Sequence, residues 1–363
     1  MIEQGAATGA RIGIDTLTDF GAAVLEALGV PDADARLVSD SLVSADLWGH
    51  PSHGMMRLPW YAARLRSGAM VAVTTPKTLV DTGPLVLLDG HDGVGQVVTD
   101  GATTLAVERA RDHGVGAVAV RNSNHFGTAA YWTRRMAQAG CVGILTTNGS
   151  PAMAPYGGRE KTVGANPWSV AAPGGSHPPV VLDIANTAVA RGKIYAAAER
   201  STPIPEGWAT DADGVPTTDP ERAIHGILAP MGGHKGYGIS FVMDVLSGVL
   251  TGSGYARQVV GPYVPDQPSR CGHLVIALHV DAIAGRGEFE ERIDDLIGST
   301  KAVPLAPDAD EIFYPGEIED RAEQSARAAG AVPLPAKTLR DLAALGAECS
   351  VSLETHQDKG VVD

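Results

Sequence analysis

Gly93-Val94-Gly95-Gln96-Val97-Val98 is the stretch of the chain that decides which kind of nucleotide-binding fold is possible. It follows an apolar run typical of a strand, Leu85 to Leu88, and precedes a helical pattern, Val97 to Arg111. A Rossmann phosphate loop occupies this position, but it requires a third glycine or alanine and an acidic residue at the end of the next strand. Here the third small residue is missing, and the next strand ends at Val120 followed by Arg121. The sequence therefore disfavours a Rossmann fold.

Upstream of this stretch the pattern is helical. Apolar residues recur at helical spacing from Thr16 to about Leu47, and a break at Val30-Pro31-Asp32 indicates two helices. A third helix is expected from Leu58 to about Arg66, closed by Gly68. The segment from Ser52 to Arg57 is therefore predicted to lie in a connection between two helices.

Downstream, short β-branched runs separated by glycine are interspersed with helical stretches. The predicted strands are residues 85–88, 117–120, 142–147, 180–182 and 274–280. The predicted helices are residues 97–111, 129–139, 188–200, 238–250, 322–329 and 336–345. This order is mixed rather than a regular β-α-β alternation, so an α+β domain and a doubly wound domain are equally compatible with it.

The composition is that of an ordinary globular protein. With 363 residues, of which 44% are apolar and 19% charged, the chain is long enough for two packed units. A formal net charge of -14 without a basic stretch argues against nucleic acid or an anionic membrane as a partner. Three widely spaced cysteines fit neither a disulfide framework nor a zinc site and suit a reducing compartment. With no leader-like start and no membrane-spanning run, we expect a cytoplasmic protein without a membrane partner.

A hydroxyl, an imidazole and a guanidinium lie within six residues at Ser52-His53-Gly54-Met55-Met56-Arg57. The planar fork of Arg57 can hold a carboxylate by two hydrogen bonds, and His53 can exchange a proton near neutral pH. This is the chemistry that a 2-hydroxy or 2-keto acid requires, although an ordinary surface loop is the alternative. A metal-dependent hydrolase is a further alternative, because His50 and His53 are three residues apart. No carboxylate or cysteine stands at a suitable spacing from them, so we expect no metal.

Three other segments contain candidate ligand-binding groups. Lys235 stands among the glycines from Met231 to Gly238, which suits either a phosphate or ribose edge or a flexible turn with a solvated lysine. His125 follows a predicted strand and can act as acid or base, although the Asn and Ser residues beside it also suit helix capping. Asp183 follows another predicted strand and either accepts hydrogen bonds from a ribose or amide, or caps a helix from Ala188 onward.

Taken in order, these segments resemble the type 2 malate/L-lactate dehydrogenase family, which includes ureidoglycolate and sulfolactate dehydrogenases, diketogulonate reductase and cyclic-imine 2-carboxylate reductases. Each motif is weak alone, but together and in this order they are specific, and they extend from about Ile14 to Arg340. The motifs are Ser52-His53-Gly54 with Arg57 and Tyr61, Asn122 to Gly127, Gly164-Ala165-Asn166-Pro167, Leu182-Asp183, Gly192-Lys193-Ile194, Gly232 to Gly238 and Pro315-Gly316-Glu317.

The resemblance implies an α+β fold in which a non-Rossmann NAD(P)-binding domain with a mixed sheet packs against a helical domain. We place the helical domain, for substrate and dimer contacts, at residues 1–74 joined by C-terminal helices at 321–363, and the NAD(P)-binding domain at 75–320. The resemblance further implies NAD or NADP as cofactor, a small anionic 2-keto or 2-hydroxy acid as substrate, and a homodimer with the active site close to the subunit contact.

It also implies a role for each matching residue. His53 would exchange a proton with the substrate, Ser52 would orient His53, and His125 would lie beside the reacting carbon. Which histidine is the principal acid-base stays open. The residues expected to contact the substrate are Arg57, Tyr61 and Ala165. The residues expected to contact the cofactor are Thr147, Asn148, Asp183, Ile184, Ala185, His234, Lys235, Gly236, Pro315, Gly316 and Glu317.

Two positions depart from the family pattern. Ala165 stands where the family usually has threonine, which removes a hydroxyl near the substrate, and Gly149 stands where a serine is common, which removes a hydrogen bond to the cofactor. The predicted function is NAD(P)-dependent interconversion of a small 2-hydroxy acid and its 2-keto acid. Reduction of a cyclic-imine 2-carboxylate is one alternative, and a non-catalytic nucleotide-binding relative is the other.

Overall fold

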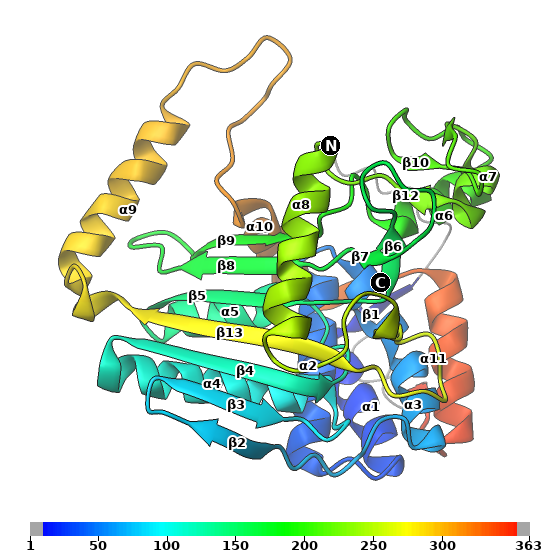
Figure 1. Ribbon diagram of the computed structural model, residues 1–363, viewed down its shortest axis with the longest axis horizontal. Coiled ribbons are helices and arrows are strands. Elements are labelled where there is room, and N and C mark those ends of the chain that lie inside the picture. The colour runs from blue at the N-terminus through cyan, green and yellow to red at the C-terminus, as the bar shows by residue number, and fades with distance from the viewer. Residues whose placement is uncertain (1–9, 354–363) are drawn as a thin grey trace.

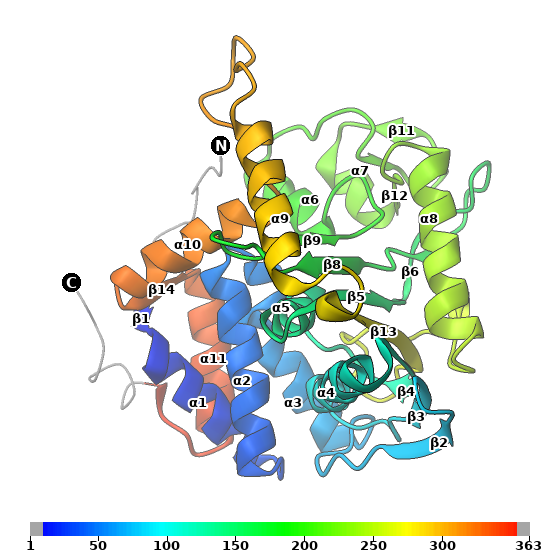
Figure 2. The ribbon, with the colours of Figure 1, turned by 90° about the vertical axis from the view of Figure 1, so that its left-hand side faces the viewer.

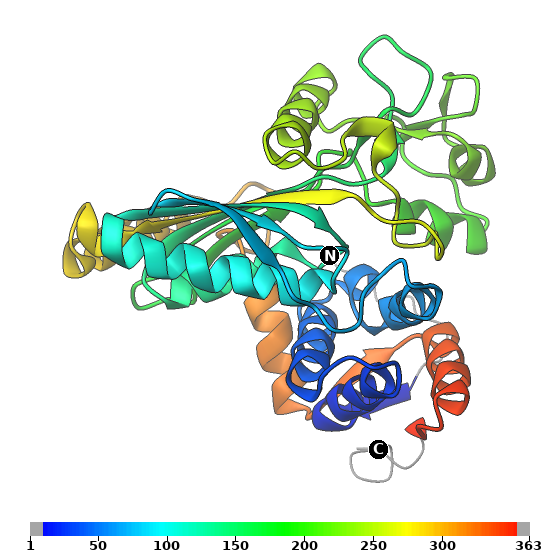
Figure 3. The same ribbon diagram turned by 60° about the horizontal axis from the view of Figure 1, so that its bottom comes forward.

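The computed structural model describes residues 10–353. Residues 1–9 and 354–363, which are the two ends of the predicted helical domain, lie outside the described part. Within it, a helical part and a smaller unit of short strands and helices lie on opposite sides of a central mixed sheet (Figure 3). No helix of residues 10–353 combines the length and the apolar character needed to cross a bilayer.

The central sheet has seven strands in the order β2-β3-β4-β13-β5-β8-β9 (Figure 1). These strands are β2 (Lys77–Asp81), β3 (Leu85–Asp89), β4 (Val115–Ser123), β13 (Cys271–His279), β5 (Cys141–Thr147), β8 (Trp168–Ala172) and β9 (Val180–Ile184). In this sheet β3 and β4 run parallel, whereas the other neighbouring pairs are antiparallel. The mixed sheet confirms the predicted α+β class with a non-Rossmann topology, since a doubly wound sheet is mostly parallel.

Two helices, α4 (Gly95–His113) and α5 (Ala129–Gln138), pack on one face of the sheet and bury an apolar core that includes Val98, Val118 and Trp132. The stretch that resembles a phosphate loop forms the start of α4. A Cβ on Gly95 would lie 2.3 Å from the carbonyl oxygen of His125 and 2.4 Å from that of Asn124. Glycine is therefore required here for close packing of the helix on the chain after β4.

The helical part contains α1 (Ile14–Ala27), α2 (Asp32–Leu47), α3 (Leu58–Ser67), α10 (Glu317–Ala328) and α11 (Ala336–Glu348). Gly68 ends α3 with φ 81°, as predicted. The two ends of the described chain meet here, because β1 (Ala10–Gly13) pairs with β14 (Ala331–Leu334), and Leu17, Leu42 and Leu342 share one apolar core (Figure 2). The predicted domain boundaries themselves stay a prediction.

The smaller unit comprises β6 (Pro151–Met153), β7 (Val163–Gly164), α6 (Arg191–Glu199), β10 (Ala209–Thr210), β11 (Pro216–Thr217), α7 (Pro220–His225) and β12 (Ile227–Leu228). It has an apolar core of its own, which contains Met153, Ile194 and Leu228. Sequence patterns predicted α6 but none of these two- and three-residue strands, because strands this short carry no readable alternation.

After the smaller unit, α8 (His234–Asp244) begins earlier than predicted and continues into a π-helical turn, Val245–Val249. Gly233 precedes it with φ 67°, and a Cβ on Gly236 would lie 2.2 Å from the carbonyl oxygen of Met231. Lys235 therefore lies in the first turn of the helix rather than in a loop before it. Further on, α9 (Arg286–Lys301) extends away from the body of the molecule (Figure 1).

Candidate active site

Two short 3₁₀ turns, Pro51–His53 and Met55–Arg57, form the connection between α2 and α3. The buried carboxylate of Asp46, near the end of α2, accepts a hydrogen bond of 2.8 Å from the backbone N–H of Met55. Gly54 fits against this carboxylate, because a Cβ there would lie 2.1 to 2.4 Å from its atoms. The connection is thus held against α2, and burial raises the pKa of Asp46 to about 7.

Four of the residues predicted for the substrate site lie close together at this connection, namely Ser52, His53, Tyr61 and His125. The rings of His53 and His125 stack with their centroids 5.7 Å apart and their planes 19° apart. Tyr61, from α3, places its hydroxyl 2.7 Å from Nδ1 of His125, and Oγ of Ser52 lies 3.0 Å from Nδ1 of His53. With Arg57, these residues are called the histidine cluster below.

Both imidazoles of the histidine cluster are neutral near pH 7. Burial, the guanidinium of Arg57 and the nearby His50 lower the pKa of His53 to about 4. Burial and then the charge of His53 lower the pKa of His125 well below its ordinary value. Burial also raises the pKa of the Tyr61 phenol, which therefore keeps its proton. The cluster thus contains neutral imidazoles, which can accept a proton, and a protonated phenol, which can donate a hydrogen bond.

Arg57 supplies the positive charge of the cluster. Its guanidinium carbon lies 3.8 Å from the centre of a Trp60 ring, and its Nε donates a hydrogen bond to the carbonyl of Ser52. Within residues 10–353, no aspartate or glutamate forms an ion pair with Arg57. A guanidinium fixed by stacking and not neutralised by the protein suits the carboxylate of a small ligand.

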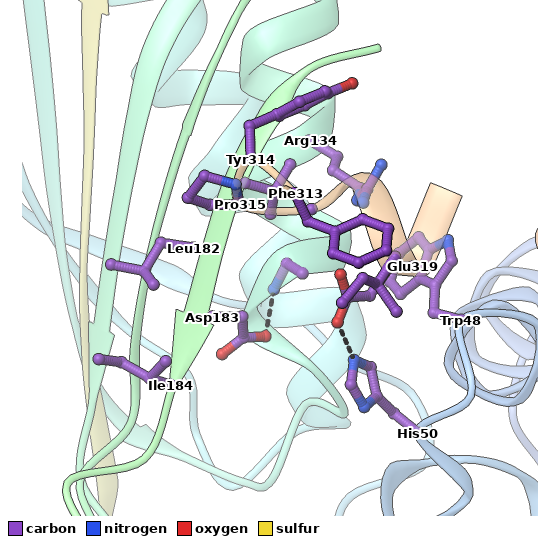
Figure 4. Close-up of a pocket in the computed structure, with 14 residues that line it drawn as sticks. Trp48, His50, Arg134, Leu182, Asp183, Ile184, Phe313, Tyr314, Pro315 and Glu319 are labelled. Carbon is purple, nitrogen blue, oxygen red and sulfur yellow. Dashed lines mark hydrogen bonds and ion pairs between the residues drawn. The ribbon is translucent and has the colours of Figure 1, made fainter. Parts of the chain in front are cut away.

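A cavity of about 350 Å³, called the edge cavity below, lies where edge strand β9 meets the turn before α10 and the helical part (Figure 4). Asp183, Ile184, Pro315 and Gly316 line it, so these four predicted cofactor residues come together. Oδ2 of Asp183 accepts a hydrogen bond of 2.7 Å from the backbone N–H of Ala130. Asp183 therefore does bind a helix N-terminus, but that of α5 rather than of the helix that follows it in sequence.

His50 lies between the edge cavity and the histidine cluster. It lines the cavity, where its Nε2 forms an ion pair of 3.4 Å with Glu319 (Figure 4). The same imidazole lowers the pKa of His53. Sequence reasoning considered His50 only as a metal ligand and missed Trp48, which lines the same cavity. Their position directly before the Ser52 to Arg57 segment is the signal that could have found them.

Two predicted cofactor residues, Thr147 and Asn148, do not line the edge cavity and use their side chains within the protein. Nδ2 of Asn148 donates hydrogen bonds of 2.8 Å to Oδ1 of Asp244 and to the carbonyl of Gly254, and its Oδ1 accepts one from Gly272. Oγ1 of Thr147 lies 2.8 Å from Nδ1 of His273. These side chains anchor the end of β5 to its neighbours.

The side chain of Glu317 is also engaged within the protein. Its carboxylate binds Nζ of Lys301 at 2.6 Å and accepts a hydrogen bond of 3.2 Å from the backbone N–H of Tyr314. The neighbouring Pro315 carbonyl accepts a 2.8 Å hydrogen bond from the backbone N–H of Val181 on β9. Glu317 thus holds the turn that forms one wall of the edge cavity.

The residues directly after Asp183 lie between the edge cavity and the segment that precedes α8. Asn186 donates its backbone N–H to the carbonyl of Ala165 at 3.0 Å, and its own carbonyl accepts a hydrogen bond of 2.9 Å from Met231. A Cβ on Gly236 would lie 2.9 Å from that Asn186 carbonyl. The first turn of α8, with His234, Lys235 and Gly236, is therefore connected to the cavity through residues 183–186. Ala165 stands at this junction, and its carbonyl is used within the protein.

Within residues 10–353, no three His, Cys, Asp or Glu side chains are grouped so as to hold a metal ion.

A family model described as malate/L-lactate dehydrogenase matches residues 12–343. L-sulfolactate dehydrogenase from Methanocaldococcus jannaschii is 40% identical over 298 residues, which cover 82% of this chain and 86% of that protein. The solved structure of the sulfolactate dehydrogenase from that organism superposes with a TM-score of 0.90 at 36% identity and covers 95% of this chain and 99% of its own.

Relatives whose names state a cofactor include both forms of nicotinamide dinucleotide. (2R)-3-sulfolactate dehydrogenase (NADP(+)) from Chromohalobacter salexigens is 38% identical over 256 residues, covering 70% of this chain and 77% of the relative. Ureidoglycolate dehydrogenase (NAD(+)) from Escherichia coli is 34% identical over 304 residues, covering 83% of this chain and 86% of the relative.

Proposed function

The chain belongs to the malate/L-lactate dehydrogenase family and is an NAD(P)-dependent oxidoreductase, and from this premise we propose that it interconverts a small anionic 2-hydroxy acid and the matching 2-keto acid. The histidine cluster is the observation that carries this proposal. It places a neutral, half-buried imidazole next to a guanidinium that has no carboxylate partner among residues 10–353. Those two groups match the hydroxyl and the carboxylate of one small acid.

Arg57 binds the substrate carboxylate in this proposal. Two parallel N–H groups of a guanidinium fix both oxygens of a carboxylate, which orients the attached C2 carbon. Stacking on Trp60 supports this role because it holds the guanidinium plane in one orientation. Tyr61 completes the site on the side of His125, where its hydroxyl is bound.

His53 carries the proton. During oxidation of the hydroxy acid its neutral imidazole takes the proton of the C2 hydroxyl, and during reduction its imidazolium returns a proton to the C2 oxygen. Ser52 orients the ring through Nδ1, which leaves Nε2 for the substrate. His125, stacked on His53 and equally neutral, stands beside the reacting carbon.

The edge cavity fits one end of NAD or NADP. Its walls combine the aromatic rings of Trp48 and Tyr314 with the carboxylate of Asp183, and such a mixture of flat apolar and polar surface suits a nicotinamide or a ribose. Glycine is required at position 316, because its φ is +95° and a Cβ there would lie only 3.0 Å from the Cβ of Val181. The turn can therefore pack closely on β9 at this wall of the cavity. When bound, the nicotinamide supplies or takes up the hydride.

The proposed cofactor contacts are of two kinds. Asp183, Ile184, Ala185, Pro315 and Gly316 belong to the edge cavity and the segment that leaves it. His234, Lys235 and Gly236 form the first turn of α8, where the positive end of the helix dipole and a lysine suit a phosphate, although the N–H of Gly236 is already bound to the carbonyl of Met231. Thr147, Asn148 and Glu317 support the site through their contacts within the protein.

We further propose that the protein is a homodimer in the cytoplasm. The end of α8 and the π-helical turn expose Phe241, Val242, Val245, Val249 and Leu250, with exposed fractions between 39% and 63%. Such a contiguous apolar face is costly in water, and a second copy of the chain would cover it. The three cysteines are free thiols, which suits a reducing compartment.

The test is a panel of 2-keto acids and cyclic-imine 2-carboxylates, each assayed with NADH and with NADPH for loss of the reduced cofactor. We expect oxidation of the cofactor by at least one 2-keto acid, at a rate that a chelator leaves unchanged. Turnover confined to cyclic imines would replace the proposed substrate class with the cyclic-imine alternative. Cofactor binding without turnover on the whole panel would instead indicate a non-catalytic relative.

A further inference from the structure

Gln96, the second residue of α4, is buried, and its amide forms no hydrogen bond of normal geometry. Its side chain is 0% exposed, and neither its Oε1 nor its Nε2 has a hydrogen-bond partner in the described part of the chain. An amide removed from water and left unpaired destabilises a folded protein, whereas a leucine of similar size does not. A residue that costs stability at a buried position is a candidate for a role in function.

The start of α4 places Gln96 next to the histidine cluster. Gly95 packs directly on the backbone of Asn124 and His125, so Gln96 follows a residue that is in contact with the segment containing His125. The amide of Gln96 lies beside the hydroxyl of Tyr61, where it opposes the burial that raises the pKa of that phenol. Tyr61 in turn has its hydroxyl 2.7 Å from Nδ1 of His125.

The hydrogen bonds at His125 determine which of its nitrogens carries the proton. The backbone N–H of Gly127 points at Nδ1 at 3.3 Å, and a backbone N–H can only donate. Nδ1 must therefore be the acceptor, which leaves the proton of the neutral ring on Nε2. The hydroxyl of Tyr61 then also donates to Nδ1, and its oxygen can accept from the two donors beside it, the backbone N–H of Gly127 and the amide of Gln96.

We propose that Gln96 is a positioning residue whose amide N–H donates to the Tyr61 oxygen, so that Tyr61 donates to Nδ1 of His125 and holds His125 as the Nε2–H tautomer. This inference rests on the proposed function of the histidine cluster. In this arrangement His125 offers Nε2–H as a hydrogen-bond donor to the C2 oxygen of the substrate and keeps its own proton. Catalytic hydrogen bonds of this kind are often long before the substrate binds, which accounts for an amide that lies beside the phenol without completing its bond.

In this proposal the two histidines have different roles. The proton of the C2 hydroxyl passes to His53, and the C2–H electron pair leaves as hydride to the nicotinamide. Meanwhile His125 stabilises the charge that develops on the oxygen. A neutral imidazole can serve as such a donor when its environment keeps its pKa low.

The hydrogen bonds from Gln96 through Tyr61 to His125 are called the relay below. Three variants test the relay, with a matched control. Gln96→Leu removes the donor and keeps the volume, and Tyr61→Phe removes the hydroxyl. Gln96→Glu replaces the donor by a carboxyl that donates only when protonated. Thr103→Val is the control, because Thr103 is buried on the same helix and its Oγ1 also lacks a partner among the described residues. The measurements are kcat, KM, the pH profile, thermal unfolding and the ¹⁵N spectrum of the histidine side chains.

We expect the wild-type spectrum to show His125 protonated at Nε2, a state that Gln96→Leu and Tyr61→Phe disturb. Gln96→Leu should lower kcat by about 10-fold with little change in KM, while its unfolding temperature stays equal or rises. Gln96→Glu should recover activity as the pH falls, and Thr103→Val should leave kcat and the spectrum unchanged.

A Gln96→Leu protein with wild-type kcat and an unchanged His125 spectrum would refute the relay and leave the proposed function intact. If Gln96→Leu does not fold, the pH profile and spectrum of Gln96→Glu decide, and a profile identical to wild type counts against the relay. A wild-type His125 protonated at Nδ1 would also refute it. Because the spectrum needs no substrate, a failure of the proposed function is seen separately, as absence of turnover in the wild type.

Discussion

The histidine cluster and the edge cavity differ in how far their charged side chains are paired within the protein. In the cluster, Arg57 has no acidic partner within residues 10–353, and its two stacked histidines are neutral. In the cavity, polar side chains are used to hold the protein together, as when Asp183 binds the N-terminus of α5 and Glu317 binds Lys301. Substitutions in the cluster should therefore change turnover at constant stability, whereas those around the cavity should change stability and cofactor affinity together.

The largest effect is expected for His53→Ala. Loss of the group that takes the substrate proton should lower kcat by about 10²- to 10⁴-fold, with the dissociation constant for NADH and the unfolding temperature nearly unchanged. Steady-state kinetics and direct cofactor titration measure both quantities. Unchanged turnover would remove His53 from the acid-base role.

Arg57→Lys should act on the substrate rather than on the proton. A lysine is a point charge and cannot reproduce the two parallel hydrogen bonds of the guanidinium, so KM should rise by about 10- to 100-fold with a smaller change in kcat. The comparison with His53→Ala separates substrate binding from proton transfer. Equal Michaelis constants for the variant and the wild type would contradict the assignment.

Glu317→Gln tests whether a substitution at the edge cavity changes stability and cofactor affinity together. This substitution removes the negative charge that Lys301 and Arg321 each bind at 2.6 Å, and so loosens the turn that contains Pro315 and Gly316. We expect the free energy of unfolding to fall by about 1 to 3 kcal/mol, together with weaker cofactor binding. Chemical denaturation and cofactor titration give the two values. Loss of cofactor affinity at full stability would instead indicate direct contact between Glu317 and the cofactor.

The pH dependence of hydroxy-acid oxidation should reveal how the cluster tunes His53. The base must be neutral, and its pKa is lowered to about 4, so kcat/KM should stay level as the pH falls through 6.5 and drop only near pH 4. Arg57→Met removes one of the causes of that low pKa and should move the drop towards higher pH. A wild-type drop at pH 6.5 would show that His53 is solvated.

The smallest effect is expected for Gly149→Ser, which restores the hydroxyl common in the family. A Cβ at Gly149 would meet nothing within 4 Å, so the side chain fits without rearrangement. One added hydrogen bond should tighten cofactor binding by roughly 3- to 10-fold and leave the unfolding temperature unchanged. Unchanged cofactor binding in this variant would place the cofactor away from Gly149.

Local patterns predicted the helices that bury a regular apolar face and failed on those that do not. The helices α1, α2 and α5 follow the predicted spacing, because their buried residues include apolar ones three or four positions apart, such as Leu17, Phe20 and Val24 in α1. No pattern predicted α9, where Ile297 is the buried residue and the others are half-buried or exposed. The start of α8 was also predicted too late, because glycines that read as a loop fit there against Met231 and Asn186.

The candidate site was predicted more completely in its substrate half than in its cofactor half. Ser52, His53 and Arg57 are neighbours in sequence, so their chemistry is visible as a motif, and the family resemblance added Tyr61 and His125. The position of His50 directly before the Ser52 to Arg57 segment was the one signal for it, and no sequence signal indicated that Gln96 would lie beside Tyr61. Those contacts join segments that approach only when the sheet and the helical part pack together.

The sequence by itself determined the absence of a Rossmann loop, the main helices and the turns around Pro51 and Gly54, because these depend on residues within one or two turns of chain. Only the tertiary structure decided that β13 lies at the centre of the sheet, that Asp183 binds the start of α5, and that the pKa of His53 is lowered. Hydrophobic periodicity and turn chemistry act over a few residues. A pKa, in contrast, depends on burial and on charges that distant segments bring within a few ångströms.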